Sequence, residues 1–99
     1  MAKFAAELNG DASGHIIIDN ENFTWRPLTL TKILSFGQAK EFSIPVKFIE
    51  GYQISTKLHW KFLHIAVAGE DTMIGFNCLK PHLIVEELKK YNPYVRMME

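Results

Sequence analysis

One cysteine and four histidines are the residues best suited to nucleophilic or metal chemistry. Cys78 and His82 are four positions apart, a spacing that would place a thiol and an imidazole on one face of a helix. Pro81 lies between them and suits the first position of a helix, so we expect Cys78 to precede that helix. A small enzyme around Cys78 and His82 is the weakest of three functional hypotheses. The two stronger hypotheses are non-enzymatic, so we expect no catalytic residue, no cofactor and no metal site.

A second group of chemically distinctive residues lies between Lys57 and Lys61. The stretch contains Lys57, His59, Trp60 and Lys61, and lysine and tryptophan side chains suit the headgroup region of a membrane. If the stretch forms the tip of a hairpin, it favours a peripheral module that binds an anionic lipid surface. The alternative is the start of a twisted strand, in which Trp60 packs on the sheet and the lysines point to water.

Composition and charge limit the other partners. The chain has 99 residues, which is enough for one domain with one hydrophobic core, and 47% of them are hydrophobic. Eleven basic and eleven acidic residues give a net charge of zero, whereas a nucleic-acid-binding protein usually has a basic excess. We therefore expect no nucleic acid partner. Zero net charge also leaves little long-range repulsion between copies, which favours self-association.

The single cysteine and the first residues of the chain indicate the cellular setting. One cysteine excludes a disulfide framework within the chain and suits a reducing compartment. The segment Met1–Gly14 contains Glu7 and Asp11, and it has no apolar run of the length found in signal peptides. No apolar run approaches the ~20 residues of a membrane-spanning helix. These features predict a cytoplasmic location.

Short runs of β-branched and aromatic residues, separated by turn residues, predict six or seven antiparallel strands. The expected strands are Phe4–Leu8 as an edge strand or a frayed start, Ile16–Ile18 paired with Phe23–Trp25, Glu41–Ile44, Val46–Thr56, Lys57–Ala68 and Thr72–Phe76. The pattern of Leu28–Lys40 fits a strand, a short helix or an interaction loop.

The strongest strand pattern, Lys57–Ala68, has apolar residues on both of its faces. Leu63 and Val67 share one face, and Trp60 and Phe62 share the other. Either the second face packs against Leu28–Phe36 within one chain, or it is an interface for a partner. The two alternatives place opposite demands on the exposure of Trp60 and Phe62.

One amphipathic helix is predicted over Pro81–Tyr91. Ile84, Leu88 and Tyr91 recur at helical spacing and form a stripe that faces a core, and Pro93 follows the end of the helix. The whole chain, 1–99, is expected to form a single domain with its core in about 14–91. Residues 92–99 are expected to be a mobile tail, whose Met97 and Met98 suit an adaptable interface.

Many short strands followed by one terminal helix predict a mainly β fold of the α+β type, in which a curled antiparallel sheet or a partly open barrel is capped by the helix. The apolar spacing and turns are distinctive in Gly14–Asp19, Phe23–Trp25, Ile44–Glu50, Phe62–Ile65, Gly69–Asp71, Gly75–Phe76 and Ile84–Leu88. This pattern, over about Gly14–Tyr91, resembles that of the bacterial pleckstrin-homology-like (PH-like) and GRAM-like domains.

The resemblance implies a non-enzymatic module, because PH-like domains bind phosphoinositides, peptides or proteins, and some bacterial members assemble into rings. The lipid-binding members carry basic residues in the loop between the first two strands. Here that loop, Leu8–Gly14, contains Asp11 and no lysine or arginine, so the family's phosphoinositide site does not carry over. We expect a protein partner or a homo-oligomer. The candidate interaction residues are Lys57, His59, Trp60, Lys61, Phe62, Met97 and Met98.

Overall fold

The computed structural model describes residues 1–30 and 40–98, so most of Leu28–Lys40 lies outside the described residues. The described elements are β1 (Ala2–Leu8), β2 (Ala12–Ile18), β3 (Asn22–Pro27), β4 (Phe42–Pro45), the short 3₁₀ helix η1 (Val46–Phe48), β5 (Ile49–Lys57), β6 (Trp60–Val67), β7 (Ile74–Asn77), α2 (Pro81–Tyr91) and β8 (Arg96–Met97). The strands form one sheet in the order β4-β3-β2-β1-β7-β6-β5-β8.

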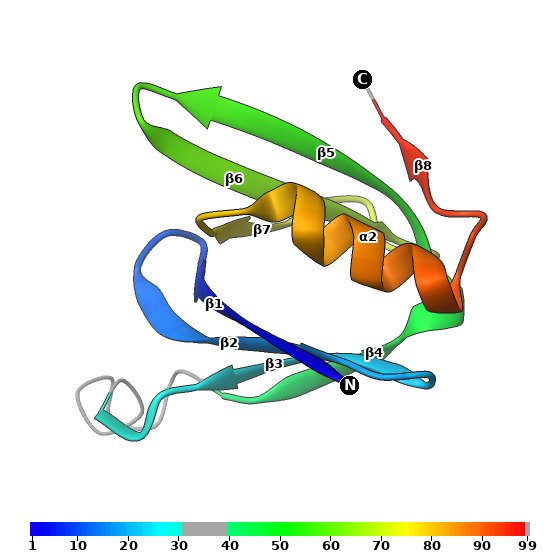
Figure 1. Cartoon of the computed structure of the whole chain (residues 1–99), viewed down its shortest axis with the longest axis horizontal. Coiled ribbons are helices and arrows are strands. Elements are labelled where there is room, and N and C mark those ends of the chain that lie inside the picture. The colour runs from blue at the N-terminus through cyan, green and yellow to red at the C-terminus, as the bar shows by residue number, and fades with distance from the viewer. Residues whose placement is uncertain (31–39, 99) are drawn as a thin grey trace.

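The sheet folds into two layers that meet where β1 pairs with β7 (Figure 1). The pairing there is short, with Glu7 opposite Asn77 and Leu8 opposite Phe76. At the other end of the fold, η1 carries the chain from β4 to β5. The sheet does not close into a barrel, because β4 and β8 are its two edges.

The expected fold class, mainly β with a helix at the C-terminal side, is confirmed. Four details of the prediction are wrong. The described residues form eight strands instead of six or seven, and β8 pairs in parallel with β5, so the sheet is not purely antiparallel. Phe4–Leu8 belongs to β1, which lies between β2 and β7 and is not an edge strand. Val46–Thr56 is not one strand, because its first residues form η1.

The core lies between the two layers and under α2. Ile16, Phe23 and Trp25 come from the first layer and Leu63 from the second, and each has no exposed surface. The Trp25 ring lies against Gly14, where a Cβ would stand 2.8 Å from it. Its Nε1 then donates to the carbonyl oxygen of Ala6 at 3.3 Å. Phe23 and Trp25 on β3, and Leu63 and Ile65 on β6, are all buried, so the alternation along these two strands predicts correctly which face is buried.

The predicted helix Pro81–Tyr91 is confirmed at both ends. Ile84, Val85 and Leu88 are buried, so the apolar stripe packs on the sheet as expected. Glu87 lies at the flank of this stripe, with its side chain only 13% exposed, and accepts from the exposed Lys90 at 2.8 Å. Figure 1 shows α2 across the open side of the two layers, where it covers the core.

Asn92 fixes the end of α2 to the start of β5. It is the only buried polar residue among residues 1–30 and 40–98. Its side-chain amide donates to the carbonyl oxygens of Val46 at 2.8 Å and of Ile49 at 3.0 Å. Its Oδ1 accepts from the backbone N–H of Tyr94 at 3.2 Å. Because every polar atom of this side chain has a partner, its burial stabilises the junction instead of weakening it.

The prediction that 92–99 is a tail outside the core is wrong. Val95 is 3% exposed and belongs to the core. β8 then pairs with β5 at Gly51 and Tyr52, and the N–H of Met98 donates to the carbonyl oxygen of Tyr52 at 2.7 Å. The tail was expected to be mobile unless a partner holds it. The structure instead holds residues 92–98 against the chain's own β5 by backbone hydrogen bonds.

Candidate interaction surface

Most of β5 has an open edge. β8 pairs with β5 only at Gly51 and Tyr52, and the rest of the strand has β6 as its only described neighbour. The carbonyl of Tyr52 points to the β8 side, because it accepts the Met98 bond. Since backbone groups alternate along a strand, the N–H and C=O groups of Ile54 and Thr56 point the same way and have no strand beside them among the described residues.

The outer half of the β5–β6 hairpin extends beyond the core. Figure 1 shows this hairpin reaching past β7 and the start of α2. Its apolar residues are correspondingly accessible: Ile54 is 38% exposed, Trp60 49% and Leu58 85%. Of the two alternatives for Lys57–Lys61, the strand boundaries show the hairpin tip, because β5 ends at Lys57 and β6 begins at Trp60. The half-exposed Trp60 does not fit the alternative in which it packs on the sheet.

The turn at this tip has an unusual residue. Leu58 has a φ of 58°, in the left-handed region that glycine and asparagine normally occupy. The β1–β2 turn meets the same demand with Asn9 and Gly10, whose φ values are 55° and 81°. A branched side chain in this conformation costs about 1–2 kcal/mol. Leu58 therefore adds backbone strain to an exposed apolar side chain.

Phe62 lies on the outer face of β6. Its ring is 6.4 Å from that of His64, and His64 Nε2 lies 3.4 Å from the hydroxyl of Ser55. Both rings are partly exposed. The alternative in which Leu28–Phe36 covers this face falls mostly on residues outside the described ranges. Its described part includes Leu28 and Leu30, which are 41% and 64% exposed.

A pocket of about 480 Å³, named here the corner pocket, opens where β1 and β7 separate beyond their two paired positions. It lies between β1 and the first residues of β6, and the turn from β7 to α2 closes one side. The hydrogen bond from the N–H of Cys78 to the carbonyl of Lys61, at 3.1 Å, holds that turn against β6. The lining residues are Ala5, Ala6, Glu7, His59, Trp60, Lys61, Asn77, Cys78 and Leu79.

The corner pocket is lined mainly by apolar surface, and lysine residues lie in or next to its lining. Trp60 is half-exposed and Leu79 is 82% exposed. Lys61 is part of the lining, and Lys80 directly follows Leu79 in the chain. Its only acidic lining residue, Glu7, is already engaged, because its two carboxylate oxygens accept from Asn77 at 3.2 Å and from Ser13 at 3.4 Å. The lysines are therefore the available charges.

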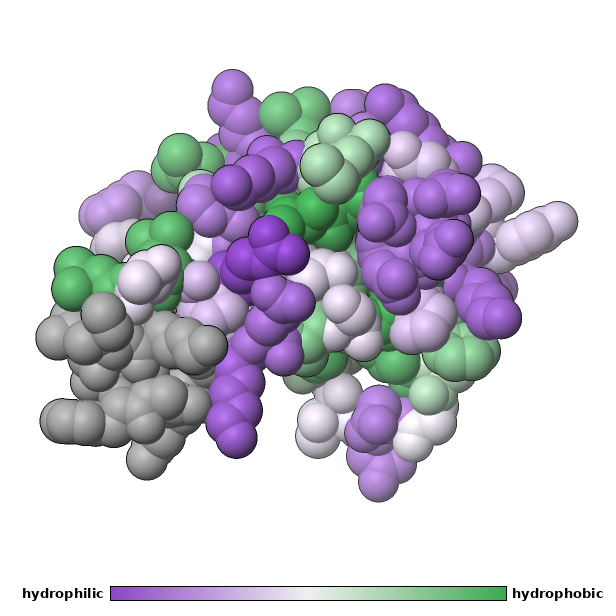
Figure 2. All heavy atoms as spheres, turned by 90° about the horizontal axis from the view of Figure 1, so that it is seen from below, coloured by the Kyte–Doolittle hydropathy of each residue, from purple (hydrophilic) through white to green (hydrophobic). Residues whose placement is uncertain are grey.

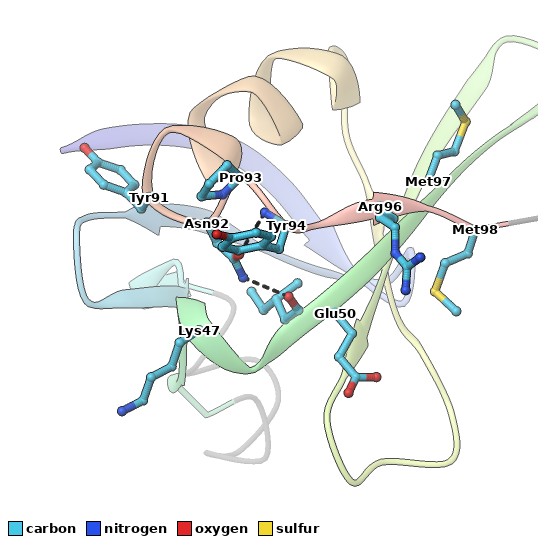
Figure 3. Close-up of a pocket in the computed structure, with 10 residues that line it drawn as sticks. Lys47, Glu50, Tyr91, Asn92, Pro93, Tyr94, Arg96, Met97 and Met98 are labelled. Carbon is cyan, nitrogen blue, oxygen red and sulfur yellow. Dashed lines mark hydrogen bonds between the residues drawn. The ribbon is translucent and has the colours of Figure 1, made fainter.

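A second and larger hollow, about 910 Å³, lies along the C-terminal segment. Figure 3 shows it between the start of β5 and the chain from Asn92 to Met98, with Tyr94 over the Asn92 side chain. Met97 is 69% exposed, whereas Met98 lies over Gly51, where a Cβ would stand 2.5 Å from its Sδ. Gly51 therefore leaves the space that Met98 fills.

The structure places five of the seven predicted interaction residues in two separate hollows, and Lys57 and Phe62 line neither of them. His59, Trp60 and Lys61 line the corner pocket, whereas Met97 and Met98 line the hollow at the C-terminal segment. Leu58, Leu79 and Lys80 were missed by sequence reasoning. Leu58 could have been found from the sequence, because an apolar residue is unusual in a two-residue hairpin turn. No signal could connect Leu79 and Lys80 to the hairpin, because their proximity comes from the fold.

The outer face of the first layer differs from the hairpin. Its polar side chains bond to each other, as Thr24 does with Ser43 at 2.8 Å and Arg26 with Glu41 at 2.6 Å. Figure 2, which views the molecule from below Figure 1, shows a mainly hydrophilic face with apolar residues in small separate groups. Among the described residues of this face, these polar pairs leave fewer free polar groups for a partner.

The thiol of Cys78 is buried, and burial raises its pKa to about 11. It is therefore protonated at neutral pH, and the thiolate that nucleophilic catalysis needs is disfavoured. His82 is exposed on α2. Within residues 1–30 and 40–98, no three or more His, Cys, Asp or Glu side chains are close enough to hold a metal ion. In the same ranges, no helix has the length and apolar character needed to span a membrane.

No protein-family model and no curated protein matches the sequence. Among solved structures, the fold is similar to a chain in the structure of the Spt16D Pob3N heterodimer, with a TM-score of 0.67 and 13% sequence identity. The match covers 99% of this chain and 55% of that chain, so this protein spans about half the length of its structural neighbour. At this identity the likeness concerns the fold alone, and with the sheet order and the terminal helix it supports a PH-like fold.

Proposed function

We propose that this protein is a non-enzymatic interaction module that binds a protein partner, or a second copy of itself, through the β5–β6 hairpin. The observation that carries the proposal is the open edge of β5 beyond β8, next to apolar side chains that extend past the core. An added strand would pair with the backbone groups of Ile54 and Thr56 and cover exposed apolar surface. The chain's own β8 already occupies the neighbouring part of this edge in the same way.

Two further observations support the proposal. The net charge is zero, which leaves association of two copies without long-range repulsion. The structural neighbour is described as part of a heterodimer of two protein chains. Neither observation identifies the partner, so the experiment addresses the edge directly.

A proline at position 56 tests the open edge. Thr56→Pro removes a backbone N–H that points outward, so the ladder between β5 and β6 stays intact. We expect it to abolish self-association, or binding of a protein partner, with a change in melting temperature of no more than a few degrees. The measurement is light scattering after size-exclusion chromatography at high micromolar concentration, with and without the partner.

The matched control is Ser55→Pro. Its N–H points to β6, so this variant should lose stability and fold poorly. If the wild type is a monomer and Thr56→Pro leaves partner binding unchanged, the open edge is not the interaction surface.

A second candidate function is binding to an anionic membrane surface through Lys57–Lys61. The exposure of Leu58 and Trp60 beside two lysines supports it. It shares the hairpin tip with the first candidate, and vesicle binding, included in the experiment below, separates the two.

A further inference from the structure

We infer that the corner pocket binds an acidic segment of a partner protein that inserts one bulky apolar side chain between Trp60 and Leu79. This inference rests on the proposed function, because it names the chemistry of the partner. It concerns a different face of the hairpin from the open edge of β5, so the two can fail separately.

The shape of the site favours a side chain over a flat surface. The corner pocket has a volume of about 480 Å³, within the range of sites that enclose small groups. Buried Ala6 and Cys78 lie at its inner end, and half-exposed Trp60 stands at its mouth. An aromatic or branched side chain can fill such a space and lose its water, which is typical of the residues that dominate protein interfaces. A bilayer surface supplies no comparable anchor.

The charges around the pocket select an acidic segment. Residues 51–69, which contain the whole hairpin tip, include Lys57 and Lys61 and no aspartate or glutamate. Lys80 adds a third cation next to Leu79. None of the three lysines forms an ion pair within the described part of the chain, whose two salt bridges involve other residues. Complementary charge would orient a partner and speed its association.

The thiol at the inner end of the pocket fits an apolar occupant. Cys78 is 6% exposed and its side chain is uncharged at neutral pH. Ala5 and Ala6 leave space because their side chains are small. The strained, exposed Leu58 stands beside His59 at the same tip. The positive φ and the 85% exposure of Leu58 are both explained by contact with a partner.

The experiment is selection from a random 12-residue peptide library displayed on phage against the folded full chain. The highest-ranking sequence is then made as a fluorescein-labelled peptide, and its Kd is measured by anisotropy. We expect the selected sequences to share two or more acidic residues and one large apolar residue. We expect binding to weaken several-fold between 50 and 300 mM salt, because charge attraction is screened.

Two substitutions in the pocket provide the structural test. Lys61→Glu and Leu79→Asp change exposed side chains, so both variants should fold, as checked by circular dichroism and melting temperature. Each should weaken the peptide by about tenfold or more. The matched control is Lys47→Glu, which makes the same charge change at an exposed lysine of η1 and should leave the Kd within twofold.

Three outcomes would overturn the inference. Selected peptides without acidic residues, or no enrichment at all, would exclude the proposed partner chemistry. Peptides whose binding is lost in Thr56→Pro but retained in Lys61→Glu and Leu79→Asp would place the site on the β5 edge, which leaves the proposed function intact. If no peptide is enriched but the protein pellets with vesicles of 70% phosphatidylcholine and 30% phosphatidylserine, and Lys61→Glu abolishes this, the tip binds a membrane instead.

Discussion

The β1–β2 and β5–β6 hairpins differ in their turn residues and in how far they extend from the core. In the first, seven consecutive residue pairs join the strands, and Asn9 and Gly10 form the turn. On its other side β2 pairs with β3 at five positions, whereas β1 pairs with β7 only at Glu7 and Leu8. The second hairpin turns at Leu58 and His59, and beyond Tyr52 its outer edge is open. The first follows the rules that stabilise a fold, whereas the second departs from them where it leaves the core.

The comparison shows how local departures indicate function. A residue that lowers the stability of a fold is often found at a functional site, where binding or catalysis retains it. In this molecule such departures gather at one hairpin tip, where strain, apolar exposure and unpaired lysines occur together. That coincidence distinguishes the tip from the remaining surface better than any single residue does.

The largest expected difference between the two hairpins comes from replacing one isoleucine of each with aspartate. Ile16→Asp on β2 puts a carboxylate where the side chain has no exposed surface, so it should destabilise the fold by several kcal/mol and leave it largely unfolded. Ile54→Asp on β5 changes a residue that is 38% exposed and should cost less than about 1 kcal/mol. Urea denaturation followed by circular dichroism measures both. Equal losses would show that the two hairpins are equally integrated into the core.

Removing the Asn92 side chain is expected to have the next largest effect. Asn92→Ala leaves the buried carbonyl groups of Val46 and Ile49 without their donor, which should cost about 2–3 kcal/mol. The start of the β5–β6 hairpin should then loosen first, while the β1–β2 hairpin keeps its protection. Amide hydrogen exchange, read strand by strand, checks this. A uniform loss of protection would contradict the assignment of Asn92 to one junction.

Exchanging the turn residues should give effects of opposite sign. Leu58→Gly relieves the positive φ and should raise stability by about 1 kcal/mol, whereas Asn9→Leu introduces the same strain and should lower it by about 1 kcal/mol. Thermal unfolding measures both. If Leu58→Gly destabilises the protein, then Leu58 packs within the chain, and its exposure has no functional meaning.

A pH dependence at alkaline pH is expected from Cys78, which lies where the two layers meet. Its pKa is raised to about 11 in the folded state, so the folded chain holds the proton more tightly than the unfolded chain does. The stabilisation is complete below the unfolded pKa of about 8.5 and is lost as the pH rises through 11. The free energy of unfolding of wild type and of Cys78→Ala is measured between pH 8 and 11. The difference between the two proteins separates the contribution of the thiol from the titration of tyrosine and lysine. Parallel curves would show that the thiol is accessible to solvent.

Sequence reasoning succeeded where the signal is local. Pro81 and the apolar spacing of Ile84 and Leu88 predict α2 at both ends, and alternation predicts the inner face of β6. The cationic and aromatic residues of Lys57–Lys61 identify the hairpin tip as a candidate site. These features depend on neighbours within a few positions, which the sequence displays directly.

The remaining features depend on contacts between distant residues. Phe4–Leu8 was expected to be an edge strand or a frayed start, and nothing in this segment indicates the pairing of β1 with β7. β8 has only two strand residues, both exposed, and is held by backbone bonds that leave no pattern of side chains. The corner pocket combines residues from β1, β6 and the turn after β7, so its existence could not be predicted before the fold. Four statements stay predictions: that the chain is a single domain, that it is cytoplasmic, that it is bacterial, and that it is GRAM-like.

The bond between Asn77 and Glu7 has a consequence for how the protein is made. It joins positions 70 residues apart, where β1 and β7 provide the strand pairing between the two layers within residues 1–30 and 40–98. A nascent chain on the ribosome cannot complete the sheet until residue 77 has left the exit tunnel. Until then the sides of β1 and β6 that face β7 are unpaired, and such edges are prone to aggregation. The late closing of a long loop also makes folding slow for a chain of this size. Slower translation before that point would prolong the period of risk, whereas rapid release of the C-terminal segment would shorten it.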